Sequence, residues 1–161
     1  MKIKFFALIA TVTFLVGIVT CNAAPRLKEI PVADIAIGGI TIGADESYVR
    51  SIYGEPTDIS YESNRCRAGP IHTKTFTYEK TFIIVFDTEN HKVFEVKSTG
   101  NNGLKTPAGF TVGMKLSDVL EHYGFGRGDE NYLAYNANWW YNIGFTAKNG
   151  KITEIHIYLT P

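Results

Sequence analysis

The stretch GFTVGMKLSDVLEHYG, from Gly109 to Gly124, decides how this chain is built, because a related stretch lies upstream of it. A shift of 70 positions, with no gap, places it on GITIGADESYVRSIYG, from Gly39 to Gly54. Seven of the sixteen positions are then identical: Gly39/Gly109, Thr41/Thr111, Gly43/Gly113, Ser47/Ser117, Val49/Val119, Tyr53/Tyr123 and Gly54/Gly124. Such an ungapped match indicates that one structural unit occurs twice in the chain.

The first copy has the pattern of a short amphipathic helix. Asp45 is a suitable N-cap, and Val49, Ile52 and Tyr53 follow at the spacing of one helical face. Gly54 tolerates the left-handed backbone that ends many helices. We therefore expect a helix between Asp45 and Gly54 whose apolar side chains face the core.

The second copy predicts the same helix with a different start. Its apolar face consists of Leu116, Val119, Leu120 and Tyr123. Gly124 ends it. Lys115 stands at the N-cap position, where its side chain offers no acceptor for the free backbone N–H groups. We therefore expect this helix to begin one or two residues late.

Strand-like runs follow each helix. The match resumes with a shift of 59, which pairs Phe86 with Phe145 and Lys92 with Lys151, so the first copy is longer by 11 residues, the difference between 70 and 59. Apolar runs predict three strands after each helix, at residues 74–78, 82–86 and 93–97 and at residues 131–135, 139–145 and 152–159. We expect an α+β fold, in which two tandem α-β-β-β units form one antiparallel sheet with both helices packed on one face.

A single domain is expected to contain both units. The repeats cover about residues 37–98 and 107–160, and the stretch between them, STGNNGLKTPAG, is too short for a flexible linker. We therefore expect residues 24–161 to unfold as one cooperative domain.

The first 23 residues have the composition of a signal peptide. Lys2 and Lys4 precede an uncharged apolar run from Phe5 to Val19, and small residues surround the expected cleavage site after Ala23. This run is shorter than the roughly 20 residues that a membrane-spanning helix needs. We expect a secreted or periplasmic protein with no membrane span. Acylation of Cys21, as in a lipoprotein, is the alternative, and it would change the location without changing the fold.

The charge balance argues against nucleic acid as a partner. The chain has 16 basic and 16 acidic residues, and loss of Lys2 and Lys4 leaves 14 and 16. This balance provides no basic field for a phosphate backbone. The sequence contains no nucleotide-binding loop, zinc-ligand spacing or nucleophile elbow, so neither a cofactor nor a metal is expected.

Two pairs of residues carry chemistry that an enzyme could use. Cys66 and His72 could form a thiol and imidazole pair, but the sequence shows no third residue that would orient them. Glu154 and His156 are two apart on an expected strand, so they share one face. An open sheet face lacks the enclosure that shifts pKa values, so no catalytic residue is assigned. Cys66 also lies in the eleven-residue surplus, where we expect a surface loop and a partly exposed thiol.

Strand alternation predicts which side chains form the working surface. The set that should pack beneath the helices is Phe82, Ile84 and Phe86 with the counterparts Tyr141, Ile143 and Phe145. The expected partner-binding surface on the opposite, outer face consists of Trp140, Asn142, Glu154, His156, Tyr158, Ile83, Val85, Glu95 and Lys97. Tryptophan, tyrosine and histidine beside paired charges are typical of a binding hot spot, and a tryptophan buried between copies of the chain is the alternative.

The helix between two glycines, followed by strands, resembles the repeat of the tandem beta-lactamase inhibitory protein fold. It is also similar to the small outer-membrane assembly lipoproteins of the SmpA/OmlA (BamE-like) kind. The resemblance rests on Gly43 and Gly113 before the helix, Val49 and Val119 within it, and Gly54 and Gly124 at its end. Both families imply a non-enzymatic protein that offers a sheet surface to another macromolecule.

The sequence therefore predicts a secreted or periplasmic binding module whose open sheet face contacts a protein or an envelope component. A structural envelope-assembly factor of the BamE-like kind is the second hypothesis. An enzyme that uses Cys66 with His72, or Glu154 with His156, is the third. The residues leave open whether the chain forms an oligomer.

Overall fold

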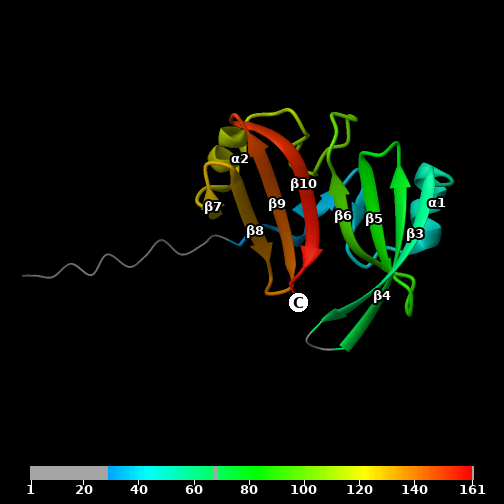
Figure 1. Ribbon diagram of the computed structural model, residues 1–161. Coiled ribbons are helices and arrows are strands. Elements are labelled where there is room, and N and C mark those ends of the chain that lie inside the picture. Colours follow the sequence, from blue (N-terminus) through cyan, green and yellow to red (C-terminus); the bar gives the residue numbers. More distant parts are fainter. Residues whose placement is uncertain (1–28, 67–68, 161) are drawn as a thin grey trace, which may run out of the picture.

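The computed structural model describes residues 29–66 and 69–160 and shows an α+β fold with two sheets and two α-helices (Figure 1). The expected signal peptide, residues 1–23, and Cys21 within it lie outside the described residues. Within the described ranges, no helix combines the length and the apolar character that crossing a membrane would require.

The chain divides into two halves that each contain one α-helix. The elements of the N-terminal half, residues 36–98, are β1 (Ala36–Ile37), β2 (Ile40–Thr41), α1 (Glu46–Tyr53), β3 (Asp58–Cys66), β4 (Gly69–Tyr78), β5 (Phe82–Asp87) and β6 (Val93–Ser98). A 3-10 turn at Val32–Asp34 precedes them. The elements of the C-terminal half, residues 110–159, are α2 (Leu116–Tyr123), β7 (Arg127–Asp129), β8 (Tyr132–Ala137), β9 (Tyr141–Lys148) and β10 (Lys151–Leu159).

Eight strands form one antiparallel sheet in the order β3-β4-β5-β6-β10-β9-β8-β7 (Figure 1). The halves meet where β6 pairs with β10, with Val96 opposite Ile157. The sequence predicts three strands after each helix, whereas the structure has four. The additional strands, β3 and β7, are the two edges of the sheet, and their largely polar residues lack the apolar alternation that identifies a strand in a sequence.

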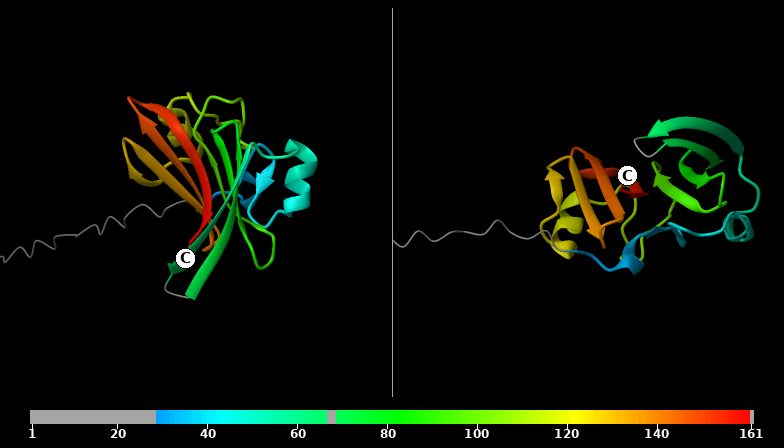
Figure 2. Two further views of the ribbon diagram at one scale, coloured as in Figure 1. Left: turned by 45° about the vertical axis from the view of Figure 1, so that its right-hand side comes forward. Right: turned by 90° about the horizontal axis from the view of Figure 1, so that it is seen from below.

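Both helices and the small β1–β2 sheet lie on one side of the large sheet (Figure 2). Strand β1 contacts the central strands β6 and β10, so the small sheet covers the middle while the helices cover the flanks. The side chains expected beneath the helices are buried there, except for the half-buried Tyr141: Phe82, Ile84, Phe86, Ile143 and Phe145. Removing these apolar surfaces from water is the main source of stability in such a layered fold.

Helices α1 and α2 begin at equivalent positions, so the late start expected for the second helix is wrong. The N–H of Glu46 donates to the carbonyl of His91 at 3.2 Å, and that of Leu116 donates to the carbonyl of Gly150 at 3.0 Å. Neither N-cap side chain bonds to its helix. Because a turn from the sheet satisfies the first N–H of each helix, a lysine is tolerated at the N-cap.

The apolar stripe of each helix is narrower than its sequence predicts. Val49 and Val119 are fully buried, as expected, whereas Ile52 is 46% exposed and Leu120 is 44% exposed. Each helix has only eight residues and contacts the sheet along one line, so neighbouring apolar positions remain in water.

The eleven additional residues of the first copy lengthen a hairpin instead of forming a loop. Strands β3 and β4 have nine and ten residues, whereas β7 and β8 have three and six. Cys66 is the last residue of β3, and its backbone pairs with Gly69. The side chain of Cys66 lies outside the described part of the chain, so its exposure stays a prediction.

The sequence alignment pairs Phe86 with Phe145, but the two residues do not occupy matching positions in the sheet. Phe86 pairs with Val93, whereas the equivalent partner, Ile152, pairs with Ala147. Ala147 therefore occupies the place of Phe86. The tight turn at residues 149–150 shortens the β9–β10 connection, and an alignment of residues alone does not detect this change of register.

Candidate functional site

The outer face of the large sheet carries two rows of side chains across the strands where the halves meet. One row pairs Ile83 with Lys97, Lys97 with His156 and His156 with Gly144. The other row pairs Val85 with Glu95, Glu95 with Tyr158 and Tyr158 with Asn142. Residues directly opposite each other in antiparallel strands project to the same side, so both halves contribute to this face.

His156 and Glu95 form the polar centre of the outer face. Nε2 of His156 lies 2.9 Å from Oε1 of Glu95, and Nζ of Lys97 lies 3.4 Å from the same oxygen. Nε2 of His156 is buried, and Glu95 is close enough to it for an ion pair. The contact with His156 is the largest cause of the lowered pKa of Glu95; burial opposes it, and the charges of His156 and Lys97 lower the pKa further. The carboxylate is therefore ionised at neutral pH.

Two tyrosines extend this centre toward the β8 side of the sheet. The ring centroids of Tyr158 and His156 are 4.6 Å apart, and the hydroxyl oxygens of Tyr158 and Tyr132 are 3.3 Å apart. A Cβ atom at Gly144 would lie 2.7 Å from the Tyr132 hydroxyl oxygen, so only glycine lets this tyrosine cross the sheet. Burial raises the pKa of Tyr132, and the hydrogen bond with Tyr158 raises it further.

Asn142 is buried, so its assignment to the partner-binding surface is wrong. Its side chain is used within the protein: Oδ1 accepts a hydrogen bond from Nη2 of Arg127 at 3.0 Å, and Nδ2 donates to Oγ1 of Thr160 at 2.6 Å. Strand alternation correctly predicts the face on which Asn142 lies. It does not reveal that side chains from β7 and the end of β10 cover that position.

Trp140 lies in the turn between β8 and β9, which corrects its assignment to a strand. Trp139 is 84% exposed and Trp140 is 63% exposed, so the two rings do not alternate between a buried face and an open one. The N–H of Thr160 donates to the carbonyl of Trp140 at 2.8 Å, and the N–H of Trp140 donates to Oδ1 of Asn138 at 3.3 Å. These bonds hold the turn beside the outer face. The sequence interpretation did not include Trp139.

The strand register and the ion pairs of the described residues do not support contact within either of the two candidate catalytic pairs. His72 lies opposite Ser63, which is three positions from Cys66 along β3. Glu154 and His156 share the outer face, but His156 contacts Glu95 instead. Among residues 29–66 and 69–160, no cluster of three or more His, Cys, Asp or Glu residues could hold a metal ion.

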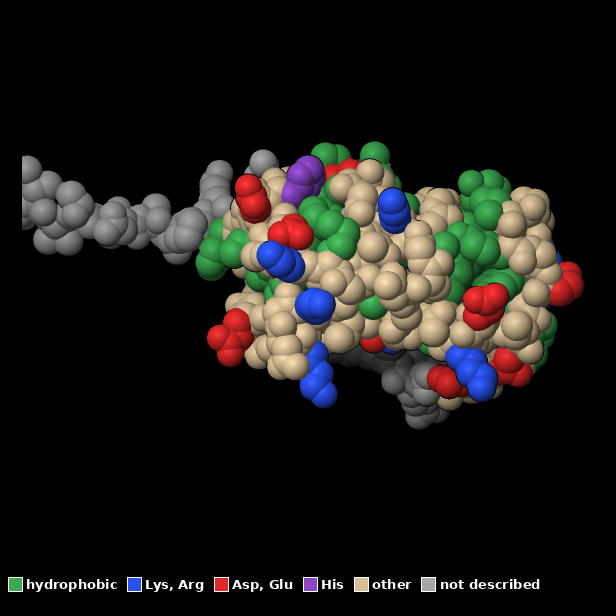
Figure 3. All heavy atoms as spheres, turned by 90° about the horizontal axis from the view of Figure 1, so that it is seen from above, with side chains coloured by type: hydrophobic (Ala, Val, Ile, Leu, Met, Phe, Trp, Pro, Cys, Tyr) green, Lys and Arg blue, Asp and Glu red, His purple; other side chains and the backbone are tan. Residues whose placement is uncertain are grey.

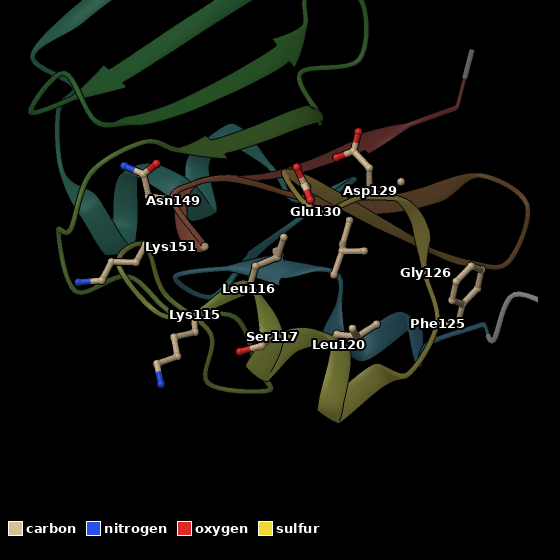
Figure 4. Close-up of a pocket in the computed structure, with 13 residues that line it drawn as sticks. Lys115, Leu116, Ser117, Leu120, Phe125, Gly126, Asp129, Glu130, Asn149 and Lys151 are labelled. Atoms are coloured by element: carbon tan, nitrogen blue, oxygen red, sulfur yellow. The ribbon is translucent and has the colours of Figure 1, made fainter.

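A pocket of about 630 Å³ opens on the other side of the sheet, between α2 and the β7–β8 hairpin (Figure 4). Leucines and an aromatic ring form its apolar wall: Leu116, Leu120, Leu133 and Phe125. Polar residues border it: Lys115, Ser117, Asp129, Glu130, Asn149 and Lys151. Its volume lies within the range of small-molecule sites, about 300–1,000 Å³.

A smaller hollow of about 430 Å³ occupies the equivalent place in the N-terminal half. Its lining is charged, and consists of Asp45, Glu46, Ser47, Arg50, Lys74 and His91. The shift of 70 places Glu46 on Leu116 and Arg50 on Leu120. The same backbone frame therefore surrounds an ionic cluster in one half and an apolar pocket in the other.

Glu46 is the centre of this ionic cluster. Nζ of Lys74 donates to its two carboxylate oxygens at 2.9 and 3.1 Å, and Nε of Arg50 donates at 3.1 Å. Burial raises the pKa of Glu46, but the hydrogen bonds and charges of Lys74 and Arg50 outweigh burial and lower the pKa on balance. The guanidinium carbon of Arg50 also lies 4.5 Å from the centroid of the Phe76 ring.

The hairpin beside the pocket in the C-terminal half is short and contains glycine. Gly128 is opposite Leu133, at the position that Ile59 occupies opposite Phe76 in the longer hairpin. Gly128 has a φ of 131°, and a Cβ atom there would lie 1.9 Å from the carbonyl oxygen of Tyr132. A side chain at position 128 would therefore collide with the backbone of Tyr132, so glycine is required where the hairpin borders the pocket.

The sequence interpretation missed this pocket because it used the identical positions of the two copies. The signal lies in the positions that differ, where Asp45, Glu46 and Arg50 are replaced by Lys115, Leu116 and Leu120. A change from charged to apolar residues on one helical face marks a surface with a different use. Comparing the two copies could not predict the register of the β7–β8 hairpin or the position of Phe125 in the pocket wall.

No family model matches the sequence, and no curated protein matches it. A solved structure of an extracellular protein containing a SCP domain, from Bacillus anthracis str. Ames, aligns with this chain with a TM-score of 0.47 and 13% sequence identity. The alignment covers 86% of this chain and 48% of that protein. The chain thus spans about half the length of the protein that it matches.

These comparisons overturn the resemblance to the beta-lactamase inhibitory protein fold and to the SmpA/OmlA (BamE-like) lipoproteins. No family model of either kind matches the sequence. The residues that suggested the resemblance are glycines and valines around a short helix. Many folds need such residues at helix ends and at buried helical positions for steric reasons, so they do not identify a family.

Proposed function

We propose that this chain is a secreted or periplasmic, non-enzymatic binding module whose outer sheet face and β8–β9 turn contact a protein or an envelope component. Export is inferred from the signal-peptide pattern of the first 23 residues. The observation that carries the binding proposal is the pair of exposed tryptophans, Trp139 and Trp140. Exposed large aromatic side chains cost free energy in water and are enriched in binding hot spots.

The arrangement of the outer face supports the same proposal. Contacts among Glu95, Lys97, His156, Tyr158 and Tyr132 hold these side chains in place before any partner arrives. A preorganised surface loses less conformational entropy on binding. On the face shown in Figure 3, acidic and basic side chains are interspersed, which supports a partner other than nucleic acid.

We also propose that the two halves are tandem copies of one helix-and-strand unit. Equivalent backbone bonds support this: Gly43 donates to Val93 as Gly113 donates to Ile152, both at 2.8 Å. The hydroxyl of Tyr78 donates to the carbonyl of Gly54, and that of Tyr135 donates to Gly124.

Affinity capture from the native envelope and medium, with partners identified by mass spectrometry, tests the binding proposal. We expect Trp140→Ala combined with His156→Ala to weaken capture by more than about tenfold, or about 1.4 kcal/mol. Thermal stability should change little because the Trp140 side chain is exposed and the His156 side chain is only partly buried.

Tyr48→Ala is the matched control, since it removes an aromatic side chain that is 47% exposed on α1, away from the outer face. It should leave capture unchanged. Equal capture by the parent and the double variant would show that the outer face is not the binding surface. Capture lost equally in the Tyr48→Ala control would show a loss that is not specific to this face.

A further inference from the structure

Two unpaired lysines stand at the pocket beside α2. Lys115 and Lys151 are joined by an isolated antiparallel bridge, as Asp45 and Lys92 are in the other half. Asp45 and Lys92 form an ion pair there, with Oδ1 and Nζ 2.7 Å apart. Among the residues that the structure describes, Lys115 and Lys151 form no ion pair. Two like charges directly opposite each other destabilise a pair of strands, so an anion would be favourable at this point.

The lysines adjoin the apolar wall of the same pocket. Figure 4 places Lys115 and Lys151 at one end, Leu116 and Leu120 in the middle, and Phe125 at the far end. Leu120 is 44% exposed and Phe125 is 61% exposed. Both side chains line the pocket, so a molecule bound there would cover them. Both ammonium groups point away from the apolar side chains in Figure 4, so the pocket has an apolar body with two flexible cationic side chains rooted at one end.

We propose that this pocket binds a monomeric single-chain anionic amphiphile of the fatty-acid type. The carboxylate lies between the ammonium groups of Lys115 and Lys151, whose flexible stems turn toward it, and the hydrocarbon chain extends over Leu120 to Phe125. The site is on the helix side of the sheet, opposite the outer face, so it is independent of the binding surface proposed above.

The acidic residues on the border do not conflict with this orientation. Asp129 and Glu130 lie along another side of the pocket, away from the two lysines (Figure 4). One carboxylate oxygen of Asp129 already accepts a hydrogen bond from the N–H of Asn131 at 2.8 Å. These carboxylates repel a second anion and so favour placement of the head group at the lysine end.

Isothermal titration calorimetry of the full chain at low ionic strength tests the proposal with dodecanoate below its micelle concentration. We expect one molecule to bind per chain, and affinity to fall as salt is added because charge pairing contributes. Acetate has the head group without the chain, and dodecyltrimethylammonium has the chain with the opposite charge. Both should bind at least about tenfold more weakly than dodecanoate.

Lys115→Asp is the decisive variant because it recreates the Asp45–Lys92 arrangement and should therefore fold normally. It should weaken dodecanoate binding about tenfold with no loss of thermal stability. Phe125→Ala should also weaken binding. Lys105→Asp makes the same change of charge at an exposed residue outside the pocket, so it should leave binding unchanged.

Four results would overturn the proposal. The first is no binding of dodecanoate, and the second is equal binding of dodecyltrimethylammonium, which would leave the lysines without a role. The third is sedimentation with anionic phosphatidylglycerol vesicles in the absence of monomer binding, which would indicate a membrane surface instead of a single molecule. Equal losses in Lys115→Asp and Lys105→Asp would likewise remove the specific contact.

Discussion

The hollow beside α1 and the pocket beside α2 each adjoin the short helix of one half but have opposite chemistry. In the N-terminal half, Glu46 bonds to Arg50 and Lys74, and the long β3–β4 hairpin supplies the lysine. In the C-terminal half, Leu116 and Leu120 occupy the two helix positions, and the short hairpin leaves them beside open space. The helix residues and the length of the hairpin together decide whether this place holds an ionic cluster or an open pocket.

The ionic cluster has a structural role that differs from that of the leucines. Partly buried ion pairs contribute little net stability over apolar side chains of similar size, but losing one partner leaves an uncompensated charge. Losing one member of the cluster is therefore expected to destabilise the N-terminal half. The leucines of the C-terminal half have no charged partner to lose.

The largest expected effect comes from placing a side chain at Gly128, in the hairpin that borders the pocket. Gly128→Ala should destabilise the protein by about 2–3 kcal/mol, because a side chain is strained at a φ of 131° and the new Cβ meets the Tyr132 carbonyl. The equivalent Ile59→Ala should cost less than about 1 kcal/mol, since Ile59 is 40% exposed. Urea unfolding of both variants measures the contrast, and similar losses would contradict the role assigned to Gly128.

The next effect comes from breaking the ionic cluster. Glu46→Leu introduces the residue found at the equivalent position of α2 and leaves Lys74 unpaired, with its side chain only 17% exposed. We expect a loss of about 1–2 kcal/mol, reduced by residual solvation of Lys74. Adding Lys74→Met should recover most of it, as measured by urea unfolding. A double variant no more stable than Glu46→Leu would show that the cluster acts through other contacts.

The same cluster should be visible in the pH dependence of stability. The pKa of Glu46 is lowered in the folded protein, so its contribution is complete above the pKa of an unfolded glutamate, about 4.3. The contribution is lost as the pH falls through the lower folded pKa. Glu46→Gln should therefore unfold with a weaker dependence on pH below about 4.3. Glu95, whose pKa is also lowered, should retain part of that dependence.

The smallest effect concerns the start of α1. Asp45→Ala should cost less than about 0.5 kcal/mol, because its pair with Lys92 is exposed and Asp45 makes no capping hydrogen bond. An ordinary N-cap aspartate contributes about 1 kcal/mol. Thermal unfolding of the variant measures the difference. A loss at the ordinary N-cap value would mean that the carbonyl of His91 does not replace the cap.

The repeated helices, their ends and the buried side of the central strands could be predicted because each rests on local pattern. The spacing of Val119 and Tyr123, and the alternation of Phe82 with Ile84, predict the burial of these side chains directly. The candidate surface was predicted less well. Its centre at Glu95 and His156 lies on the expected face. The contact between these two residues depends on the pairing of β6 with β10, and a local sequence pattern does not predict pairing between strands of separate halves.

Sequence by itself determined that two similar short helices, each followed by strands, would pack on one side of a sheet, because period and glycine position are properties of neighbouring residues. The tertiary structure decided which side chains of each half are buried, which are exposed and where a pocket opens. The burial of Asn142, the exposure of Trp139 and the opening of the pocket beside Leu120 all depend on hairpin length, turn placement and strand register. These are set by contacts between segments distant in the chain, and no local pattern records them.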